Sequence, residues 1–383
     1  MDKLNIIKSF KFRIFPSKVI AAKLENTLYL CQQLYNAALQ ERKEAYEINR
    51  ISINYRKQQD QLPEIKQTNL EYADVYCQVL RDVLVRVDFA FQGFFNRVKR
   101  KQKAGFPRFR SISRYDSFKY QQSGFSLTAN KLKLSKIGEM KIKLSRQIIG
   151  KVKTCQIKRE TGKWFVIFAV EVPVKPLIKT NKSVGIDVGI SAFATLSDGT
   201  KIENFKYYEK SQKKLRVAQR SVSRKKKGSS CRRKAVLRLR KIHQKIRNQR
   251  NDFAHKISTH LIKNFDLIAI EKLNISGLSK GMFSKQIHDV AWSNFFNMLR
   301  YKAVEAGRQL VEIKPAFTSQ DCSGCGNRVK KDLSVRVHRC LVCNLQIDRD
   351  YNAAINILNK AIGQMVESVK LGNSSCLLSE SLI

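Results

Sequence analysis

The chain has 383 residues, with 74 lysines and arginines against 31 aspartates and glutamates, a formal net charge of +43. Because so many unbalanced cations repel one another, the composition predicts a polyanionic partner rather than a merely soluble basic protein. No apolar run approaches the roughly 20 residues of a spanning helix, which disfavours a membrane protein. The start has no signal-peptide pattern, so we expect a cytoplasmic protein whose nine cysteines are thiols.

The N-terminal part of the chain predicts a β-domain interrupted by helices. Phe10 and Phe12 alternate with cations in residues 1–16, which indicates a half-buried strand. In residues 17–110 apolar side chains recur at helical spacing, and in residues 111–178 the period returns to two. We therefore expect one antiparallel barrel made by the first and third segments, with the second inserted as a helical unit.

The stretch "KRKQKAGFPRFRS", residues 99–111, interleaves cations with phenylalanines. This composition suits phosphate contacts combined with base or sugar stacking. A solvated loop whose phenylalanines plug the core explains the same letters equally well. The candidate nucleic-acid contacts in this loop are Phe106, Arg108 and Arg110.

Residues 205–262 predict a cationic helical hairpin. Between Lys210 and Asn251 there are 18 lysines and arginines and no acid. Leu239 and Ile246 belong to a helical apolar stripe, so the segment is a packed helix with a cationic face, and "KKKGSS" marks its turn. A charge run is usually only a solvated face, but the complete absence of acids favours nucleic-acid binding. The candidate contacts are Arg224, Lys225, Lys226, Lys227, Arg232 and Arg233.

Three acidic residues lie on different elements of one predicted sheet. Asp187 is in the first, otherwise apolar, strand of a meander that begins "SVGIDVG". Glu271 ends the buried strand predicted at 267–270, where open sheets place their ligands, although it could simply reach solvent. Asp350 lies at the N-terminus of a helix, so one of Asp348 and Asp350 could cap the helix while the other turns to the site. Together the acids match the oxygen ligands of two-Mg²⁺ phosphodiester hydrolysis.

Four cysteines have the spacing of a structural zinc site. Cys322 and Cys325 form one Cys-x2-Cys pair, Cys340 and Cys343 form another, and 14 residues separate them. A closed set of four thiolates predicts one structural Zn²⁺ with no open position for catalysis. His338 is a possible substitute ligand, but the four sulfurs already fill the shell.

The motifs "KFRIFP", "GFPRFR", "GIDVG", "IAIEKLN", "CSGCG", "CLVC" and "DRDYNAAINI" in this order resemble the TnpB family, transposon-encoded RNA-guided DNA endonucleases related to type V CRISPR effectors. The resemblance implies an α+β multidomain fold with a wedge-type β-barrel and a helical recognition insertion. It further implies an RNase H-like (RuvC) nuclease domain over residues 179–314 and 346–364, with a zinc-ribbon insertion at 315–345. The tail, residues 365–383, lies beyond the resemblance, and the sequence leaves open whether it is ordered or disordered.

The resemblance also implies roles. Asp187, Glu271 and Asp350 match the three RuvC acids, which selects Asp350 over Asp348 for the site. The implied partners are a noncoding guide RNA and double-stranded target DNA next to a short adjacent motif, bound by a monomeric ribonucleoprotein. The polar candidates for reading that motif are Gln78, Tyr120 and Gln121.

Three alternative functions remain open at this point. A small type V CRISPR effector is the nearest neighbour and is poorly separated by sequence. A guided DNA-binding repressor would be expected to lack one of the acids, and all three are present. A transposase proper would join DNA ends, whereas the resemblance favours cutting.

Overall fold

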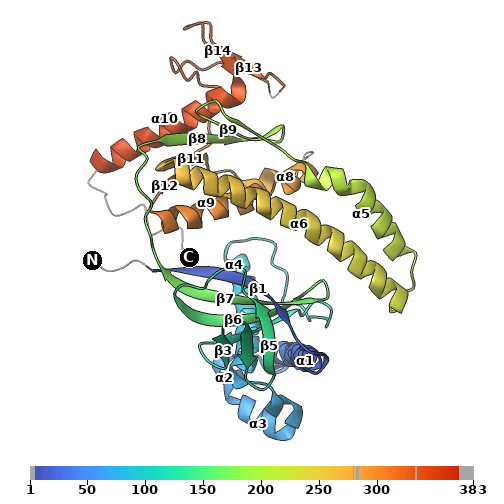
Figure 1. Cartoon of the computed structure of the whole chain (residues 1–383). Helices are drawn as coiled ribbons and strands as arrows, with labels where there is room; N and C mark the ends of the chain where they lie inside the picture. The colour runs from blue at the N-terminus through green and yellow to red at the C-terminus, as the bar shows by residue number, and fades with distance from the viewer. Residues whose placement is uncertain (1–4, 279, 282–283, 333, 371–383) are drawn as a thin grey trace. The chain divides into compact units, whose positions relative to one another are not determined.

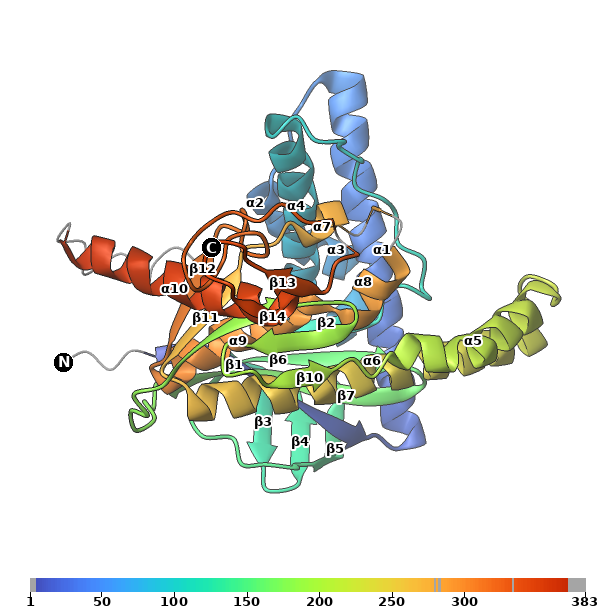
Figure 2. The same cartoon turned by 90° about the horizontal axis from the view of Figure 1, so that it is seen from above.

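The computed structural model describes residues 5–278, 280–281, 284–332 and 334–370 (Figures 1 and 2). The chain divides into two compact units, Met1–Pro173 and Val174–Ile383. Within the described ranges, no helix is both long and apolar enough to cross a bilayer. The domain boundaries predicted above are finer than this division and stay predictions, and most of the predicted tail lies outside the described residues.

The first unit is built on a seven-stranded antiparallel sheet. Its strands run in the order β2-β6-β7-β1-β5-β4-β3, which curls into a nearly closed barrel with β2 and β3 at its edges. The strand bounds are β1 Asn5–Phe15, β2 Ser117–Gln121, β3 Phe125–Thr128, β4 Lys131–Leu134, β5 Gly138–Lys143, β6 Lys151–Glu160 and β7 Lys163–Pro173. Phe10 of β1 pairs with Phe168, and Phe12 pairs with Val166. The prediction that the first strand joins the later sheet is therefore confirmed.

The segment between β1 and β2 is mainly helical, as predicted. It contains α1 Lys18–Asn49, α2 Tyr55–Asp60, α3 Leu62–Thr68, the 3-10 helix η1 Leu70–Asp74 and α4 Cys77–Lys99. Helix α1 begins after Pro16 because the side chain of Ser17 accepts a hydrogen bond from the N–H of Ile20. Leu24 and Leu28 of α1 share one buried core with Phe12 of the sheet.

The second unit is built on a five-stranded mixed sheet with the order β10-β9-β8-β11-β12. The strand bounds are β8 Ser183–Val188, β9 Ala192–Leu196, β10 Lys201–Glu203, β11 Leu267–Glu271 and β12 Gln309–Ile313. Strands β8, β9 and β10 form the predicted antiparallel meander, and β11 runs parallel to both β8 and β12. All five residues of β11 are buried, as its apolar run predicts.

Helices cover both faces of this second sheet, as Figure 1 shows. One face packs against α6 Ser230–Asn264 and α9 Trp292–Ala306, and the other packs against α10 Arg349–Lys370. The remaining elements are α5 Tyr207–Ser223, α7 Ile275–Leu278, α8 Ser284–Val290, β13 Val337–Arg339 and β14 Gln346–Asp348. A sheet covered on both faces explains why β11 is apolar throughout.

Asp266 ties together the entries to three of these strands. Its carboxylate accepts hydrogen bonds from the backbone N–H groups of Thr180 and Asn181, at 2.8 and 2.7 Å, and forms an ion pair with Arg308. Burial acts to raise the pKa of Asp266, but the hydrogen bonds from Thr180 and Asn181 and the charge of Arg308 outweigh it, so the pKa is lowered. The lowered pKa means that this carboxylate stabilises the fold above its unfolded-state pKa, roughly 3.9, and that the gain is lost as the pH falls.

We therefore expect Asp266→Asn to lower the melting temperature at pH 7, with a difference from the wild type that shrinks as the pH falls through about 4. The control is Asp252→Asn, which removes an exposed i,i+4 partner of Lys256 and should change little. Thermal unfolding followed by circular dichroism between pH 3 and 7 measures both. A difference that stays constant over this range would contradict the assignment.

Candidate active site

The pairing of β8 with β11 brings two of the predicted acids together. Ile270 lies opposite Ile186 in the parallel register, so the next residues along the two strands, Glu271 and Asp187, are neighbours. Adjacent strands lie about 4.8 Å apart, and alternate residues point to opposite faces. Asp187 and Glu271 therefore share one face at the carboxyl end of both strands, the face covered by α10.

A glycine lets α10 approach this face closely. A Cβ atom on Gly185 would lie 2.1 Å from the carbonyl oxygen of Ala354 and 2.8 Å from the backbone nitrogen of Leu358. Only a residue without a side chain fits there, so the helix lies directly on β8. Ile357 and Ala361 of the same helix share a buried core with β11 and β12. The N-terminal turn of α10 is thereby held beside the two acids.

The structure separates the roles of Asp348 and Asp350. Asp348 Oδ1 accepts the backbone N–H groups of Asp350 and Tyr351 at 2.9 and 3.1 Å, which makes Asp348 the cap of α10. Its other oxygen accepts a hydrogen bond from Lys201 at 2.8 Å. Burial acts to raise the pKa of Asp348, but the bonds from Lys201 and Tyr351 lower it. Asp350 is in the first turn of the helix, where its Oδ1 contacts the guanidinium of Arg349 at 3.0 Å.

The charges of the other acids act on Asp187. Burial, followed by the charges of Glu271 and Asp350 and, more weakly, of Asp348, raises the pKa of Asp187 well above its usual range, and the charge of Arg349 opposes the shift. Glu271 is 9% exposed, and burial raises its pKa against a hydrogen bond from Thr318. The alternative that Glu271 simply reaches solvent is therefore wrong. Full ionisation of this group is costly without a cation nearby.

A hollow of about 290 Å³ reaches the end of β11 on the side of α9. Most of the residues that line it are polar. Its polar lining consists of Glu271, Lys272, Asn274, Ser293, Asn297, Arg300 and Glu312.

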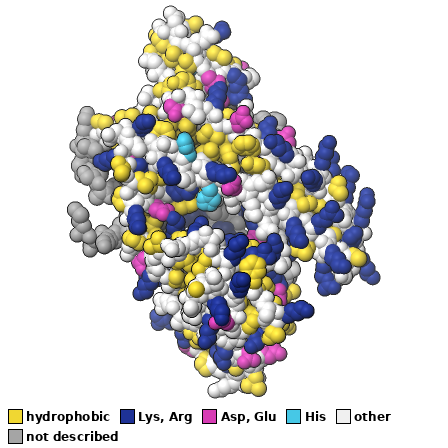
Figure 3. All heavy atoms as spheres, in the orientation of Figure 1, with side chains coloured by type: hydrophobic (Ala, Val, Ile, Leu, Met, Phe, Trp, Pro, Cys, Tyr) yellow, Lys and Arg dark blue, Asp and Glu magenta, His cyan; other side chains and the backbone are white. Residues whose placement is uncertain are grey.

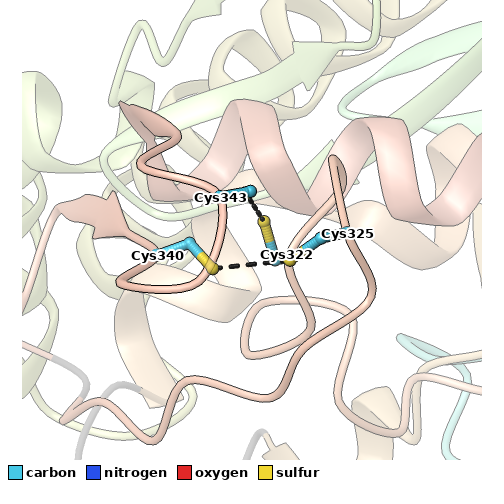
Figure 4. Close-up of side chains that lie close together, drawn as sticks. All are labelled: Cys322, Cys325, Cys340 and Cys343. Atoms are coloured by element: carbon cyan, nitrogen blue, oxygen red, sulfur yellow. Dashed lines mark hydrogen bonds between the residues drawn. The ribbon is translucent and has the colours of Figure 1, made fainter.

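The four cysteines form a compact cluster, shown in Figure 4. Their sulfur atoms all lie within 4.8 Å of one another, with Cys322 and Cys343 at 3.5 Å and Cys325 and Cys340 also at 3.5 Å. In the described part of the chain this is the group of metal-ligand side chains drawn close enough to hold an ion; the three carboxylates do not form such a cluster. Backbone N–H groups, that of Cys343 first, lower the pKa of the Cys340 thiol to about 6, whereas at Cys325 and Cys343 such backbone bonds are outweighed by burial and hydrogen bonds with neighbouring thiols, which raise the pKa. Four sulfurs this close together fit Zn²⁺.

His338 lies outside the sulfur cluster. Its side chain is fully buried, and its Nδ1 faces the ammonium of Lys331 rather than a metal position. Burial and the charge of Lys331 lower the pKa of His338. The cluster therefore holds only the four predicted sulfurs, as the spacing indicates.

The predicted cationic hairpin is present as α5 and α6, which pack against each other and project from the second sheet (Figures 1 and 2). Figure 3 shows lysine and arginine side chains gathered over this projection. Arg232 has a local role, because its guanidinium donates to the carbonyls of Val222 and Lys225 at 2.9 and 2.8 Å and so closes the turn. Lys225 is half-buried, and the other candidates are exposed: Arg224, Lys226, Lys227 and Arg233.

In the basic loop of the first unit, residues 99–111, packed and exposed side chains occur together. Phe106 packs edge-on against Phe91 and Phe94, with ring centroids 5.6 and 5.4 Å apart, yet it is 45% exposed. Arg108 is exposed. The guanidinium of Arg110 lies 4.9 Å from the centre of the Tyr35 ring, which anchors the end of the loop to α1.

The three candidates for motif reading have different environments. Tyr120 is 1% exposed and donates its hydroxyl to the carbonyl of Ser135 at 3.0 Å, so it is a core residue and its burial does not support a direct contact. Gln121 is half-buried and faces Asp82 at 3.4 Å. Gln78 is half-buried in the first turn of α4.

Sequence reasoning missed three residues that contact the acids: Thr318 donates to Glu271, and Arg349 and Arg336 form ion pairs with Asp350. Thr318 lies four residues before Cys322, and Arg349 lies between the two aspartates of "DRD". Thr318 and Arg349 thus lie next to recognisable motifs, but no sequence pattern of their own marks them.

Three family models match the chain: "Probable transposase" over residues 167–282, "Cas12f1-like, TNB domain" over 292–357, and "Helix-turn-helix domain" over 1–50. Over the described residues of the last range, 5–50, the structure has one strand and one long helix, β1 and α1. The chain is also similar to a protein of Escherichia coli (strain K12), provisionally named RNA-guided DNA endonuclease InsQ, with 33% identity over 94% of this chain and 95% of that protein. The chain belongs to the TnpB family.

A second relative of this TnpB-family chain, from Streptomyces pristinaespiralis and provisionally named an RNA-guided DNA endonuclease, is 36% identical over 92% of this chain and 89% of that protein. The solved structure of the mini-RNA-guided endonuclease CRISPR-Cas_phi3 aligns with a TM-score of 0.51 at 10% identity, covering 94% of this chain and 92% of that one. It supports the multidomain α+β fold. The family predicted from the motifs is thus confirmed.

We expect the purified full-length protein to carry about one Zn²⁺ per chain, because four close sulfurs fill a tetrahedral shell. Replacing Cys322 and Cys325 with Ser should remove the zinc and lower the melting temperature. The matched control replaces Cys77 and Cys231, two exposed cysteines outside the cluster, with Ser. This variant should retain the zinc and the wild-type melting temperature. Elemental analysis with thermal unfolding measures this, and a stable, zinc-free wild type would contradict it.

Proposed function

We propose that this chain is an RNA-guided DNA endonuclease of an insertion-sequence transposon, cutting at a single site formed by Asp187, Glu271 and Asp350. The observation that carries the proposal is the register of β8 and β11, which makes two acids neighbours under the helix end that carries the third. The strand order β10-β9-β8-β11-β12 with helices on both faces supports an RNase H-like (RuvC) domain, and the cysteine cluster supports its zinc-ribbon insertion. The names of the relatives support the same activity.

The three carboxylates fit Mg²⁺ in chemistry and charge. Hard oxygen ligands suit Mg²⁺; burial raises the pKa of both Asp187 and Glu271, and for Asp187 the charges of Glu271 and Asp350 raise it further. When bound there, two Mg²⁺ would activate water and stabilise the leaving 3′ oxygen of the phosphodiester. The chain's own residues hold the acids in place: Asp348 caps α10, and Thr318 orients a Glu271 oxygen.

The proposed partners are a noncoding guide RNA and double-stranded target DNA. The exposed cations of the α5–α6 hairpin provide phosphate contacts, and Phe106 with Arg108 provides a stacking and phosphate contact in the first unit. In this mode base pairing reads the sequence while the protein holds the backbone. Gln78 and Gln121 remain the candidates for reading the adjacent motif, in a monomeric ribonucleoprotein.

A small type V CRISPR effector is the second candidate, because residues 292–357 match the Cas12f1-like TNB domain. The whole-length similarity to relatives named RNA-guided DNA endonucleases favours the transposon-encoded class. A guided repressor is disfavoured because all three acids are present in the sequence and the register makes two of them, Asp187 and Glu271, neighbours. A transposase proper, suggested by the description "Probable transposase", would need a strand-transfer target that hydrolysis does not need.

We expect Asp187→Ala to abolish Mg²⁺-dependent cleavage while RNA and target binding stay nearly intact. The cleavage rate should fall by more than the roughly 100-fold typical of losing a residue that only orients a metal ligand. The control is Asp198→Ala, which changes an exposed acid in the next turn of the same meander. Cleavage of a labelled duplex by the copurified ribonucleoprotein, with sequencing of its RNA, measures this. Normal cutting by the Asp187 variant, or a heterogeneous RNA without a guide, would overturn the proposal.

A further inference from the structure

Thr318 contacts Glu271 inside the protein. It lies in the segment between β12 and the cysteine cluster, and its hydroxyl donates to Glu271 Oε1 at 2.5 Å. Both side chains are buried, with 4% of Thr318 and 9% of Glu271 exposed. A threonine hydroxyl has one proton to donate, and an ionised carboxylate only accepts. The carbonyl of Pro315 is a second acceptor within reach but lies farther away, at 3.4 Å, so the hydroxyl proton is directed to one oxygen of Glu271.

A hydrogen bond to one carboxylate oxygen sets the direction of the other. With Oε1 held by Thr318, rotation of the carboxylate about its terminal bond is restricted, and Oε2 is the oxygen that this hydrogen bond does not engage. Groups that orient a metal-binding carboxylate in this way contribute to affinity without touching the metal.

The segment that carries Thr318 is itself held by one face of α10. Asn352, Asn356 and Lys360 are spaced four residues apart, so they lie on the same side of the helix. Asn356 Nδ2 donates to the carbonyls of Thr318 and Asp321 at 2.9 and 2.7 Å.

The other two members of this face bind the rest of the segment. Asn352 donates to the carbonyl of Asp321 at 2.8 Å and accepts the N–H of Ser323, next to Cys322, at 2.9 Å. Lys360 donates to the carbonyl of Ala316 at 2.9 Å. Asn352 is fully buried and Asn356 is 7% exposed, so these bonds are not shared with bulk water.

From these contacts we propose that Thr318 is a positioning residue for the Glu271 carboxylate, held in place by α10, so that the segment leading into the cysteine cluster also orients the active site. This proposal rests on the proposed function, since it assigns Glu271 a cation. It gives the segment from residue 316 to residue 323 a role in the reaction beyond linking two modules. The helix that carries Asp350 is then the same element that sets the orientation of Glu271.

The test separates the hydroxyl of Thr318 from its methyl group. Thr318→Val keeps the shape and removes the donor, whereas Thr318→Ser keeps the donor and removes the methyl group. Thr27→Val is the matched control, because Thr27 is equally buried, 6% exposed, and donates to a backbone carbonyl within α1. Thr318→Ala gives the same loss of donor with less volume if the valine variant does not fold.

The readout is Mn²⁺ binding to the full-length ribonucleoprotein, measured by electron paramagnetic resonance. Binding at the proposed site is the part of the bound-Mn²⁺ signal that is absent from the Asp187→Ala variant. We expect Thr318→Val to weaken Mn²⁺ binding about 10- to 100-fold and to raise the Mg²⁺ concentration for half-maximal cleavage by a similar factor. Thr318→Ser and Thr27→Val should bind Mn²⁺ like the wild type, even if each lowers the melting temperature.

Wild-type Mn²⁺ binding by both Thr318→Val and Thr318→Ala would overturn the positioning role while leaving the proposed function intact. Loss of binding in Thr318→Ser equal to that in Thr318→Val would also overturn it, because packing of the methyl group would then explain the effect. A wild type with neither Asp187-dependent Mn²⁺ binding nor cleavage would overturn the proposed function, and the positioning role with it.

Discussion

The parallel pairing of β8 with β11 is the constraint on which the rest of the second unit depends. It makes Asp187 and Glu271 neighbours on one face, at the carboxyl end of two buried strands. The other features follow from this placement: Gly185 lets α10 lie on the same face, and Asp348 caps the helix so that Asp350 is held in its first turn. Together these contacts hold the first turn of α10 beside the two acids.

The chain as a whole and the acids at the second sheet carry charges of opposite sign. The chain as a whole is strongly cationic, with a net charge of +43, and its longest acid-free stretch lies on α5 and α6. Acidic side chains gather on the face of the sheet beneath α10, and Arg349 and Arg336 both form ion pairs with Asp350 there, at 3.0 and 3.7 Å. A surface of the first kind favours a polyanionic partner, and a group of carboxylates of the second kind would favour a divalent cation. The two requirements are compatible because they concern different elements of the unit.

Much of the fold could be predicted from periodicity, and the limits have physical causes. Alternation identified β1 and its sheet, and the apolar run with Glu271 at its end identified β11, because burial dictates these patterns. Pattern alone could not assign Asp348 as the cap, since both aspartates suit a helix start, or exclude Tyr120, whose hydroxyl finds a backbone carbonyl inside the core. Thr318 was missed because a hydrogen bond between residues 47 positions apart leaves no local signal.

The central claim is that Asp187, Glu271 and Asp350 serve one cation site, from which Asp348 is excluded as a cap. Mn²⁺ binding to the ribonucleoprotein, measured for Asp187→Asn, Glu271→Gln, Asp350→Asn and Asp348→Asn, tests it most directly. Binding should weaken roughly 100-fold or more in the first three variants and only a few-fold in Asp348→Asn, whose amide oxygen can still cap α10. Loss of binding in Asp348→Asn with wild-type binding in Asp350→Asn would contradict the account.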